Sequence, residues 1–322
     1  MKPIVKDNNI HHNVLHPTII WDTTKYCNYK CIYCYCTYMP NRLIENPIKF
    51  SIDHISNSFK HFLPNWVINY IGGEPFLLKN FIELNQKITE NNYIALYTNL
   101  SLDNQIYSFA QKISPERVTF INCALHVAER TKTDPKFDRF INLYKTLQTN
   151  SFPVFVTYIV HPTLKDRIID DINFFAEKGI KIYLKVFRGA FENKSYPESY
   201  DKNLISIIEK YEPQIIRGSS IRTQITGESK LCRAGLIFLE MDSKGNVYRC
   251  LTERSQRRNR LGNLFDNTLD IHKRPEICTL DNCNNARQGM AHLFGSSSNF
   301  FNPSIENYEK CIINPTIAES NL

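Results

Sequence analysis

Six short apolar runs alternate with helix-like patterns over the first two thirds of the chain, and this alternation limits the fold more than any other feature. The apolar runs cover Thr18–Asp22, Trp66–Ile71, Tyr93–Tyr97, Arg117–Leu125, Val154–Val160 and Lys181–Phe187. The helix-like patterns cover Ser51–Phe62, Lys79–Glu90, Asp103–Lys112, Phe137–Thr149, Lys165–Lys178 and Leu204–Tyr211. Parallel strands need crossover connections, usually helices, so this order predicts an α/β fold whose parallel sheet is open or curled into a partial barrel.

Residues at the ends of these patterns support the predicted helix boundaries. Ser51 and Asp103 stand where a side-chain oxygen could accept from the free N–H groups of a first turn, so we expect both as N-caps. Gly179 follows Lys178, where a glycine in the left-handed conformation commonly ends a helix.

Unusual residues follow each apolar run at the same end. They are the cysteine-rich loop from Lys25 to Cys36, then Gly72-Gly-Glu-Pro75, Thr98-Asn99, Ala124-Leu-His126, His161-Pro162 and Arg188-Gly189. In parallel α/β folds the ligand sites lie at the carboxyl ends of the strands. We therefore expect the six stretches to meet at one rim of the sheet.

The pattern changes after about residue 215. Leu236–Met241 and Asn246–Cys250 flank the turn-rich Asp242-Ser-Lys-Gly245, which predicts a β-hairpin. Beyond Asn263 we expect no further strand, only an irregular tail that carries cysteines. The sequence thus predicts a core domain over residues 15–213 and a small second domain over residues 214–322.

Composition and charge narrow the class of protein. The 322 residues are 42% hydrophobic and 22% charged, as in an ordinary globular protein. We expect a cytoplasmic protein, because the chain starts without a signal-peptide core and no apolar run reaches the roughly 18–20 residues that span a bilayer. The net charge of +7 includes five arginines between Arg249 and Arg260, which form either a solvated loop or an RNA-binding patch.

Ten cysteines in such a chain indicate metal ligation rather than a disulfide framework. Cys27, Cys31 and Cys34 form a C-x3-C-x2-C pattern, whose thiolates can converge on one soft metal centre. Three ligands would leave one coordination position open. A partial zinc site is the alternative, but it needs a fourth ligand, and Cys36 is awkwardly close in sequence.

Two motifs together resemble the radical S-adenosylmethionine (radical SAM) superfamily. They are the cysteine pattern, with Tyr33 as the aromatic residue before its last cysteine, and Gly72-Gly-Glu-Pro75 one strand later. The resemblance covers roughly residues 15–215 and implies a partial (β/α)6 barrel of the TIM type. It also implies a [4Fe-4S] cluster on the three cysteines, with SAM chelating the fourth iron.

The resemblance further implies residue roles and a reaction. The cofactor-binding residues would be Gly72 and Gly73 at the methionine part of SAM with Glu74 nearby, Tyr33 against the adenine, and Thr98 and Asn99 near the ribose. In this family a reduced cluster passes one electron to SAM, and the resulting 5′-deoxyadenosyl radical abstracts a substrate hydrogen atom. An electron donor such as flavodoxin or ferredoxin is therefore expected.

Cys232, Cys250, Cys278 and Cys283 form a second group, for which scattered core thiols or a zinc ribbon are the plain interpretations. Their order around the predicted hairpin is similar to the twitch domain, the short form of the SPASM extension of radical SAM enzymes. This similarity implies one auxiliary [4Fe-4S] cluster, with Cys311 in reserve if Cys278 is not a ligand. Four protein ligands would suit the cluster to electron transfer, whereas three would leave room for substrate.

Four residues at the predicted rim are candidates for catalysis or substrate contact, although none is assigned a catalytic role. They are His126, His161, Lys185 and Arg188. Each alone is typical of a structural or solvent-facing residue, but together they would form a cationic mouth for an anionic or heavily hydroxylated substrate. Cys123 lies within a predicted strand and is expected to be a buried structural thiol.

The sequence therefore predicts a radical SAM enzyme in which an auxiliary cluster supports oxidation of a small polar metabolite, such as a sugar, an aminocyclitol or a nucleotide derivative. The stretch before the first strand is short for a peptide-binding domain, which favours the metabolite slightly. Radical modification of a ribosomally made peptide or a protein side chain is the second interpretation. A non-catalytic zinc- and RNA-binding module is the third. Neither a membrane nor nucleic acid is expected as a partner.

Overall fold

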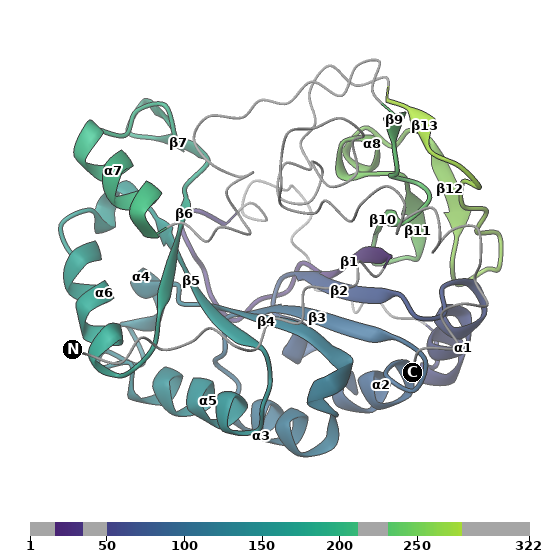
Figure 1. Cartoon of the computed structure of the whole chain (residues 1–322), viewed down its shortest axis with the longest axis horizontal. Helices are drawn as coiled ribbons and strands as arrows, with labels where there is room; N and C mark the ends of the chain where they lie inside the picture. Colours follow the sequence, from purple (N-terminus) through teal and green to yellow (C-terminus); the bar gives the residue numbers. More distant parts are fainter. Residues whose placement is uncertain (1–16, 35–49, 212–230, 279–322) are drawn as a thin grey trace, which may run out of the picture.

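The computed structural model describes residues 17–34, 50–211 and 231–278. Its main feature is a nine-stranded sheet in the order β12-β11-β10-β1-β2-β3-β4-β5-β6 (Figure 1). Its strands are β1 (Thr18–Thr24), β2 (Val67–Gly72), β3 (Tyr93–Thr98), β4 (Val118–Ala124), β5 (Val154–Val160), β6 (Ile182–Val186), β10 (Phe238–Met241), β11 (Asn246–Tyr248) and β12 (Arg260–Asn263). The α-helices are α1 (Ile52–Phe62), α2 (Phe81–Ile88), α3 (Asp103–Lys112), α4 (Val127–Arg130), α5 (Asp138–Thr149), α6 (Ile168–Glu177), α7 (Lys202–Tyr211) and α8 (Leu251–Ser255).

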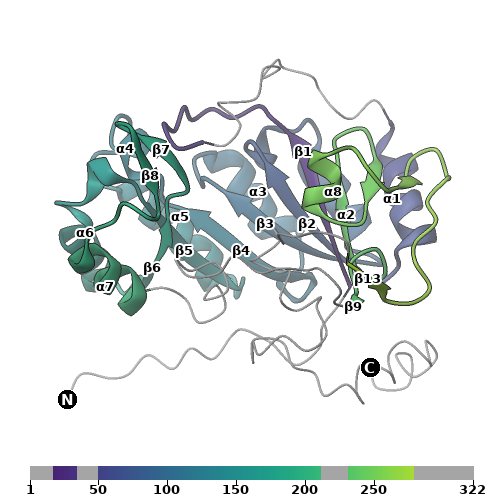
Figure 2. The same cartoon turned by 90° about the horizontal axis from the view of Figure 1, so that it is seen from above.

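Strands β1 to β6 run parallel in chain order, and helices cover the outer face of the curved sheet (Figures 1 and 2). This is the predicted partial barrel. All six predicted strands and all six predicted helices are present, with ends that differ by at most three residues. The short helix α4 and the hairpin of β7 (Gly189–Phe191) and β8 (Lys194–Tyr196) were not predicted.

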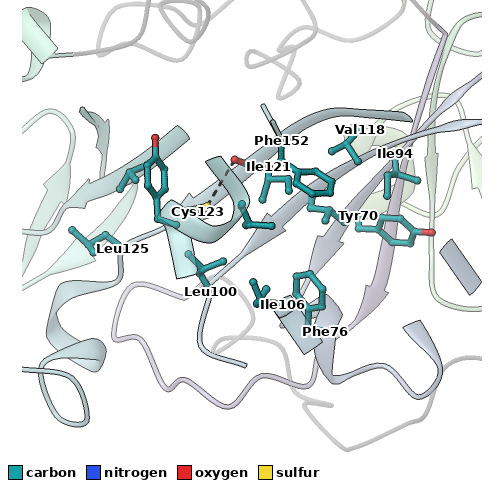
Figure 3. Packing of buried hydrophobic residues seen from close by; sticks show 14 of the residues in the cluster. Tyr70, Phe76, Ile94, Leu100, Ile106, Val118, Ile121, Cys123, Leu125 and Phe152 are labelled. Carbon is teal, nitrogen blue, oxygen red and sulfur yellow. Dashed lines mark hydrogen bonds between the residues drawn. The ribbon is translucent and has the colours of Figure 1, made fainter. Parts of the chain in front are cut away.

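Side chains on β1 to β6 alternate between the helices and the opposite, inner face of the sheet. On β4, Ile121 and Cys123 are fully buried under the helices, where Figure 3 shows them with Leu100 and Ile106. The prediction that Cys123 is a structural thiol is therefore supported by its burial. Each buried aliphatic side chain of this size stabilises the fold by about 1.5–3 kcal/mol relative to exposure.

Two of the three predicted helix ends are confirmed. Ser51 caps α1, because its hydroxyl accepts from the backbone N–H of His54. Gly179 takes a φ of +74° after α6, and the N–H of Ile180 donates to the carbonyl of Phe175, as in a Schellman motif. The prediction for Asp103 was wrong: it is the first residue of α3, and its negative charge there favours the helix dipole instead.

The predicted hairpin is present as β10 and β11, which pair antiparallel across the turn at residues 242–245. It does not form a separate sheet. β10 pairs parallel with β1, so the hairpin and β12 extend the sheet of the barrel. The domain boundary near residue 213 lies outside the described residues and stays a prediction.

The prediction of no strand beyond Asn263 was wrong, because β13 (Glu276–Ile277) pairs with β9 (Leu231–Cys232). This pair joins segments more than 40 residues apart in sequence and contains only two residues on each side, too few for a periodic signal. Within the described part of the chain, no helix combines the length and apolar character needed to cross a membrane.

Candidate active site

The cysteine-rich loop follows β1 directly and brings Cys27, Cys31 and Cys34 together. The backbone N–H of Cys34 donates to the carbonyl of Cys31 at 3.0 Å, and the N–H of Tyr29 donates to the sulfur of Cys27 at 3.4 Å. Burial, and then the nearby thiols of Cys27 and Cys34, raise the pKa of Cys31 to about 12. The loop by itself thus disfavours thiolates, and a bound metal centre would supply the positive charge that removes their protons.

The chemistry of this donor set fits an iron–sulfur cluster with three protein ligands. Within residues 17–34, 50–211 and 231–278, no group of three or more His, Cys, Asp or Glu side chains could hold a metal ion as they stand. A [4Fe-4S] cluster places each thiolate on a separate iron, so its ligands are spread more widely than those of one ion.

Gly72 and Gly73 are required by the close approach of the chain's own backbone. The N–H of Gly73 donates to the carbonyl of Thr24 at 2.5 Å, and the N–H of Glu74 donates to the carbonyl of Tyr26 at 2.9 Å. A Cβ on Gly73 would overlap the Tyr26 carbonyl, and Gly72 has a φ of +124°. These glycines therefore let the start of the cysteine loop lie on the end of β2.

Glu74 joins the ends of β2 and β3 and is almost fully buried. Its carboxylate accepts from the hydroxyl of Thr98 at 2.8 Å, the N–H of Asn99 at 2.7 Å and the N–H of Phe76 at 3.2 Å. Both carboxylate oxygens are therefore engaged by the protein itself. Burial nevertheless outweighs these bonds and raises the pKa of Glu74 to about 7.

Asn99 extends this network to the cysteine loop. Its side-chain N–H₂ donates to the amide oxygen of Asn28 at 2.9 Å and lies 3.7 Å from the sulfur of Cys27. Its amide oxygen accepts from the Ser101 hydroxyl at 2.5 Å. The predicted pair Thr98-Asn99 thus lies next to the first cysteine, at the rim where the sequence placed it.

Tyr33, His126 and His161 form an aromatic group above the sheet. The hydroxyl of Tyr33 lies 3.0 Å from Nδ1 of His126, and the ring of Tyr33 lies 5.8 Å from each of the two imidazole rings. Burial, with the positive charges of Arg130 and Lys185, lowers the pKa of His126 to about 3. Burial also lowers the pKa of His161, which disfavours its charged form.

The two predicted cationic rim residues lie in different environments. Lys185 is buried on β6, with its ammonium group 5.2 Å from the centre of the Tyr97 ring. Arg188 is exposed just after β6. The predicted cationic mouth is therefore corrected: Lys185 lies inside the barrel, and Arg188 lies on its surface.

Arg130 is a fully buried residue that the sequence reasoning missed. It donates to the carbonyls of Leu125 and Asn99 and lies over the ring of Phe140 at 4.4 Å. It thus holds the carboxyl ends of β3 and β4 together beneath the cysteine loop. No spacing signal marks it, since a single arginine after His126 is typical of an exposed helix residue.

The second cysteine group is also partly assembled. Cys232, Cys250 and Cys278 are all buried in one small cluster with Phe238 and Ala234. Backbone N–H groups at the start of α8 point at the sulfur of Cys250, whose pKa burial raises to about 12. Cys283, Cys311 and Cys36 lie outside the described residues.

A buried ionic group connects the two cysteine regions. Arg254 on α8 pairs with Asp22 on β1 at 3.0 Å and with Glu240 on β10 at 3.7 Å. Lys25, at the start of the cysteine loop, also pairs with Asp22. Arg249 is buried and donates to backbone carbonyls, so neither Arg249 nor Arg254 belongs to a solvated loop.

Comparisons with known proteins agree with this geometry. The family model of the Radical SAM superfamily matches residues 21–176. The chain contains a radical SAM domain. None of the curated proteins matches it.

Solved radical SAM structures share the fold at low sequence identity. Streptococcus suis SuiB bound to S-adenosylmethionine has 15% identity and a TM-score of 0.55, covering 79% of this chain. This chain spans only 65% of the length of SuiB. Native anSMEcpe with bound AdoMet has 17% identity and a TM-score of 0.55, covering 94% of this chain and 98% of its own.

Proposed function

We propose that Cys27, Cys31 and Cys34 hold a [4Fe-4S] cluster whose fourth iron binds SAM. The observation that carries this proposal is the packing of the three-cysteine loop on the Gly72-Gly73 turn, inside the segment matched by the family model. When bound and reduced, the cluster supplies the electron that cleaves SAM to a 5′-deoxyadenosyl radical.

The chain's own residues hold and enclose this site. Asn99 orients the loop at Cys27, and Glu74 joins the ends of β2 and β3 beneath it. Gly72 and Gly73 are proposed to serve SAM as well as the loop, and Thr98 lies with them at the same strand ends. Tyr33 and His126 form an aromatic wall that can exclude water from a reactive radical.

We also propose that Cys232, Cys250, Cys278 and Cys283 hold one auxiliary [4Fe-4S] cluster. The burial of three of these thiols in one group supports it. Such a site suits electron transfer, as in oxidation of a substrate radical, and flavodoxin or ferredoxin would supply the first electron.

The proposed reaction is oxidation of a small polar metabolite in the cytoplasm. The buried Lys185, whose positive charge lies close enough to His126 to lower the pKa of that imidazole, supports a polar substrate. Peptide modification is the second candidate, because solved neighbours include SuiB bound to the precursor peptide SuiA and anSMEcpe with the Kp18Cys peptide.

Anaerobic reconstitution tests the proposal. We expect about eight irons with matching sulfide, and 5′-deoxyadenosine on reduction in the presence of SAM. The variant Cys34→Ala should lose 5′-deoxyadenosine formation, whereas Cys123→Ala, a buried thiol of β4, should retain its iron. Zinc in place of iron, with no 5′-deoxyadenosine, would contradict the assignment.

A further inference from the structure

The inner face of the barrel carries a layer of polar side chains directly below the rim. On β4, β5 and β6 they are Asn122, Thr157 and Lys185, which we call the Asn122 layer. They alternate with side chains that point into the helix-covered core, such as Cys123 and Tyr158. All three are at least nine-tenths buried.

An aromatic row fills the same face nearer the amino ends of the strands. Ring centres lie 5.8 Å apart for Phe120 and Phe155, and 6.2 Å apart for Phe155 and Tyr183. Each of these residues comes two positions before a member of the Asn122 layer. The layer therefore lies between this apolar floor and the rim that carries the cysteine loop.

The fold does not use all the hydrogen-bonding capacity of this layer. The hydroxyl of Thr157 donates to the amide oxygen of Asn122 at 2.7 Å. The side-chain N–H₂ of Asn122 is buried and, among the described residues, has no hydrogen-bond partner. On β2, the amide oxygen of Asn69 is likewise buried without a partner in the described part of the chain.

Unpaired buried amides cost free energy, so a native protein rarely keeps two of them on one face without a use. Lys185 adds a second donor to the layer. Its ammonium group lies over Tyr97, and Tyr97 pairs in register with Asn122. An amide N–H₂ and an ammonium group can only donate, so both select for an oxygen acceptor.

We propose that the Asn122 layer binds a carboxylate or carbonyl oxygen of the substrate, and that Asn69 accepts from a hydroxyl or amino group of the same molecule. This inference rests on the proposed function, because it names the substrate class of that site. The substrate is then a compact molecule with an oxygen acceptor at one end and a hydrogen donor at the other.

The first test measures stability. Where a buried polar residue serves a ligand rather than the fold, its replacement by an apolar residue stabilises the ligand-free protein. The double variant Asn122→Leu/Thr157→Val removes both partners of a bond together with the unpaired N–H₂. We expect its melting temperature to rise by about 2–4 °C. The melting temperature of the single variant Asn69→Leu should rise as well.

The matched control is Asn92→Leu. Asn92 is as buried as Asn122, but its side chain donates to the carbonyl of Leu63, so its replacement should lower the melting temperature. If the Asn122 and Asn69 variants also lost stability, these residues would serve the fold, and the proposal would be overturned.

The second test measures the binding of trifluoroacetate to the anaerobically reconstituted protein by fluorine nuclear relaxation. Trifluoroethanol, which has no carboxylate, is the control probe. Trifluoroacetate should bind about tenfold more weakly to Lys185→Met and to the double variant than to the natural protein. Equal fluorine relaxation of trifluoroacetate with the natural protein, Lys185→Met and the double variant would mean adventitious binding only. It would overturn the proposal that the Asn122 layer binds a carboxylate or carbonyl oxygen.

These outcomes can be separated from failure of the proposed function. The natural protein's iron content and 5′-deoxyadenosine formation test the cluster and SAM, with no role for the Asn122 layer. A protein that lacks iron but shows the expected stability changes would refute the cluster and keep the polar site.

Discussion

The two cysteine groups of this protein are built in different ways. Cys27, Cys31 and Cys34 lie on one short loop after β1, and two of the three are only half-buried. Cys232, Cys250 and Cys278 come from β9, from the end of the hairpin and from the residue after β13, and all three are buried.

The difference shows how much of each site local structure can determine. The first group needs only a loop of eight residues and a strand end to lie on. In the second group, 17 residues separate Cys232 from Cys250, and 27 separate Cys250 from Cys278. Its assembly therefore depends on the pairing of β9 with β13 and of β10 with β1. The first group is therefore expected to be sensitive to loop contacts, and the second to tertiary packing.

The largest expected effect separates the two groups directly. The variant Cys31→Ala should lower 5′-deoxyadenosine formation at least about 100-fold, since it removes a proposed ligand of the SAM-binding cluster. The variant Cys250→Ala should lose about half of the iron and keep the spectral change that SAM causes in the first cluster. Iron analysis and electron paramagnetic resonance check both. Equal loss of both signals in Cys250→Ala would show that the groups do not form independently.

The next effect concerns the ionic connection between the groups. The variant Arg254→Ala leaves the buried carboxylate of Asp22 without this partner and should lower the free energy of unfolding by about 3 kcal/mol. Denaturant unfolding measures it. The control Arg258→Ala, an exposed arginine nearby, should stay within about 0.5 kcal/mol of the natural protein. A small effect of Arg254→Ala would mean that the two regions are held together without this group.

A smaller effect should be confined to the first group. The variant Gly73→Ala places a methyl group against the Tyr26 carbonyl and should cost about 2–3 kcal/mol of stability. The control Gly179→Ala has open space around it and only the cost of its positive φ, about 1 kcal/mol. Iron bound at the first group should fall only in Gly73→Ala. An equal loss of stability in both variants would refute the close approach.

The smallest effect is a pH dependence near the second group. Burial raises the pKa of Glu240 to about 8, above its value of about 4.5 in the unfolded chain, so the folded state keeps a proton that the unfolded state releases. This contribution is full below about pH 4.5 and is lost as pH rises to about 8. The variant Glu240→Gln should flatten that slope between pH 5 and 8. An unchanged slope would place the titration on another group, such as Glu74.

Much of the fold could be predicted because each signal is local. An apolar run or a 3.6-residue period needs only neighbouring residues, so the strands and helices of the barrel were found within three residues of their ends. Short elements such as α4 and β13 were missed, because four or two residues contain no full period. Asp103 was predicted to be the N-cap of α3 but is its first residue, because Asp is favoured both at the N-cap and in the first turn.

The candidate site was predictable only where a motif was contiguous. Arg130 and the pairing of Thr157 with Asn122 went unnoticed, because burial of a polar side chain depends on which strand or helix lies opposite. Lys185 and Arg188 looked alike in sequence, three residues apart at a strand end, yet only Lys185 points into the barrel. Its side chain falls on the inner face of β6, whereas Arg188 comes after the strand has ended.

By itself the sequence determined the order of strands and helices, the cysteine loop and the glycine turn beneath it, because each depends on residues close together in the chain. Only the tertiary structure decided that the hairpin joins the barrel sheet, that Cys232, Cys250 and Cys278 meet, and that Asn122 and Asn69 share one inner face. Those relations follow from strand register across long connections, and register is set by packing of the whole sheet rather than by any single stretch of residues.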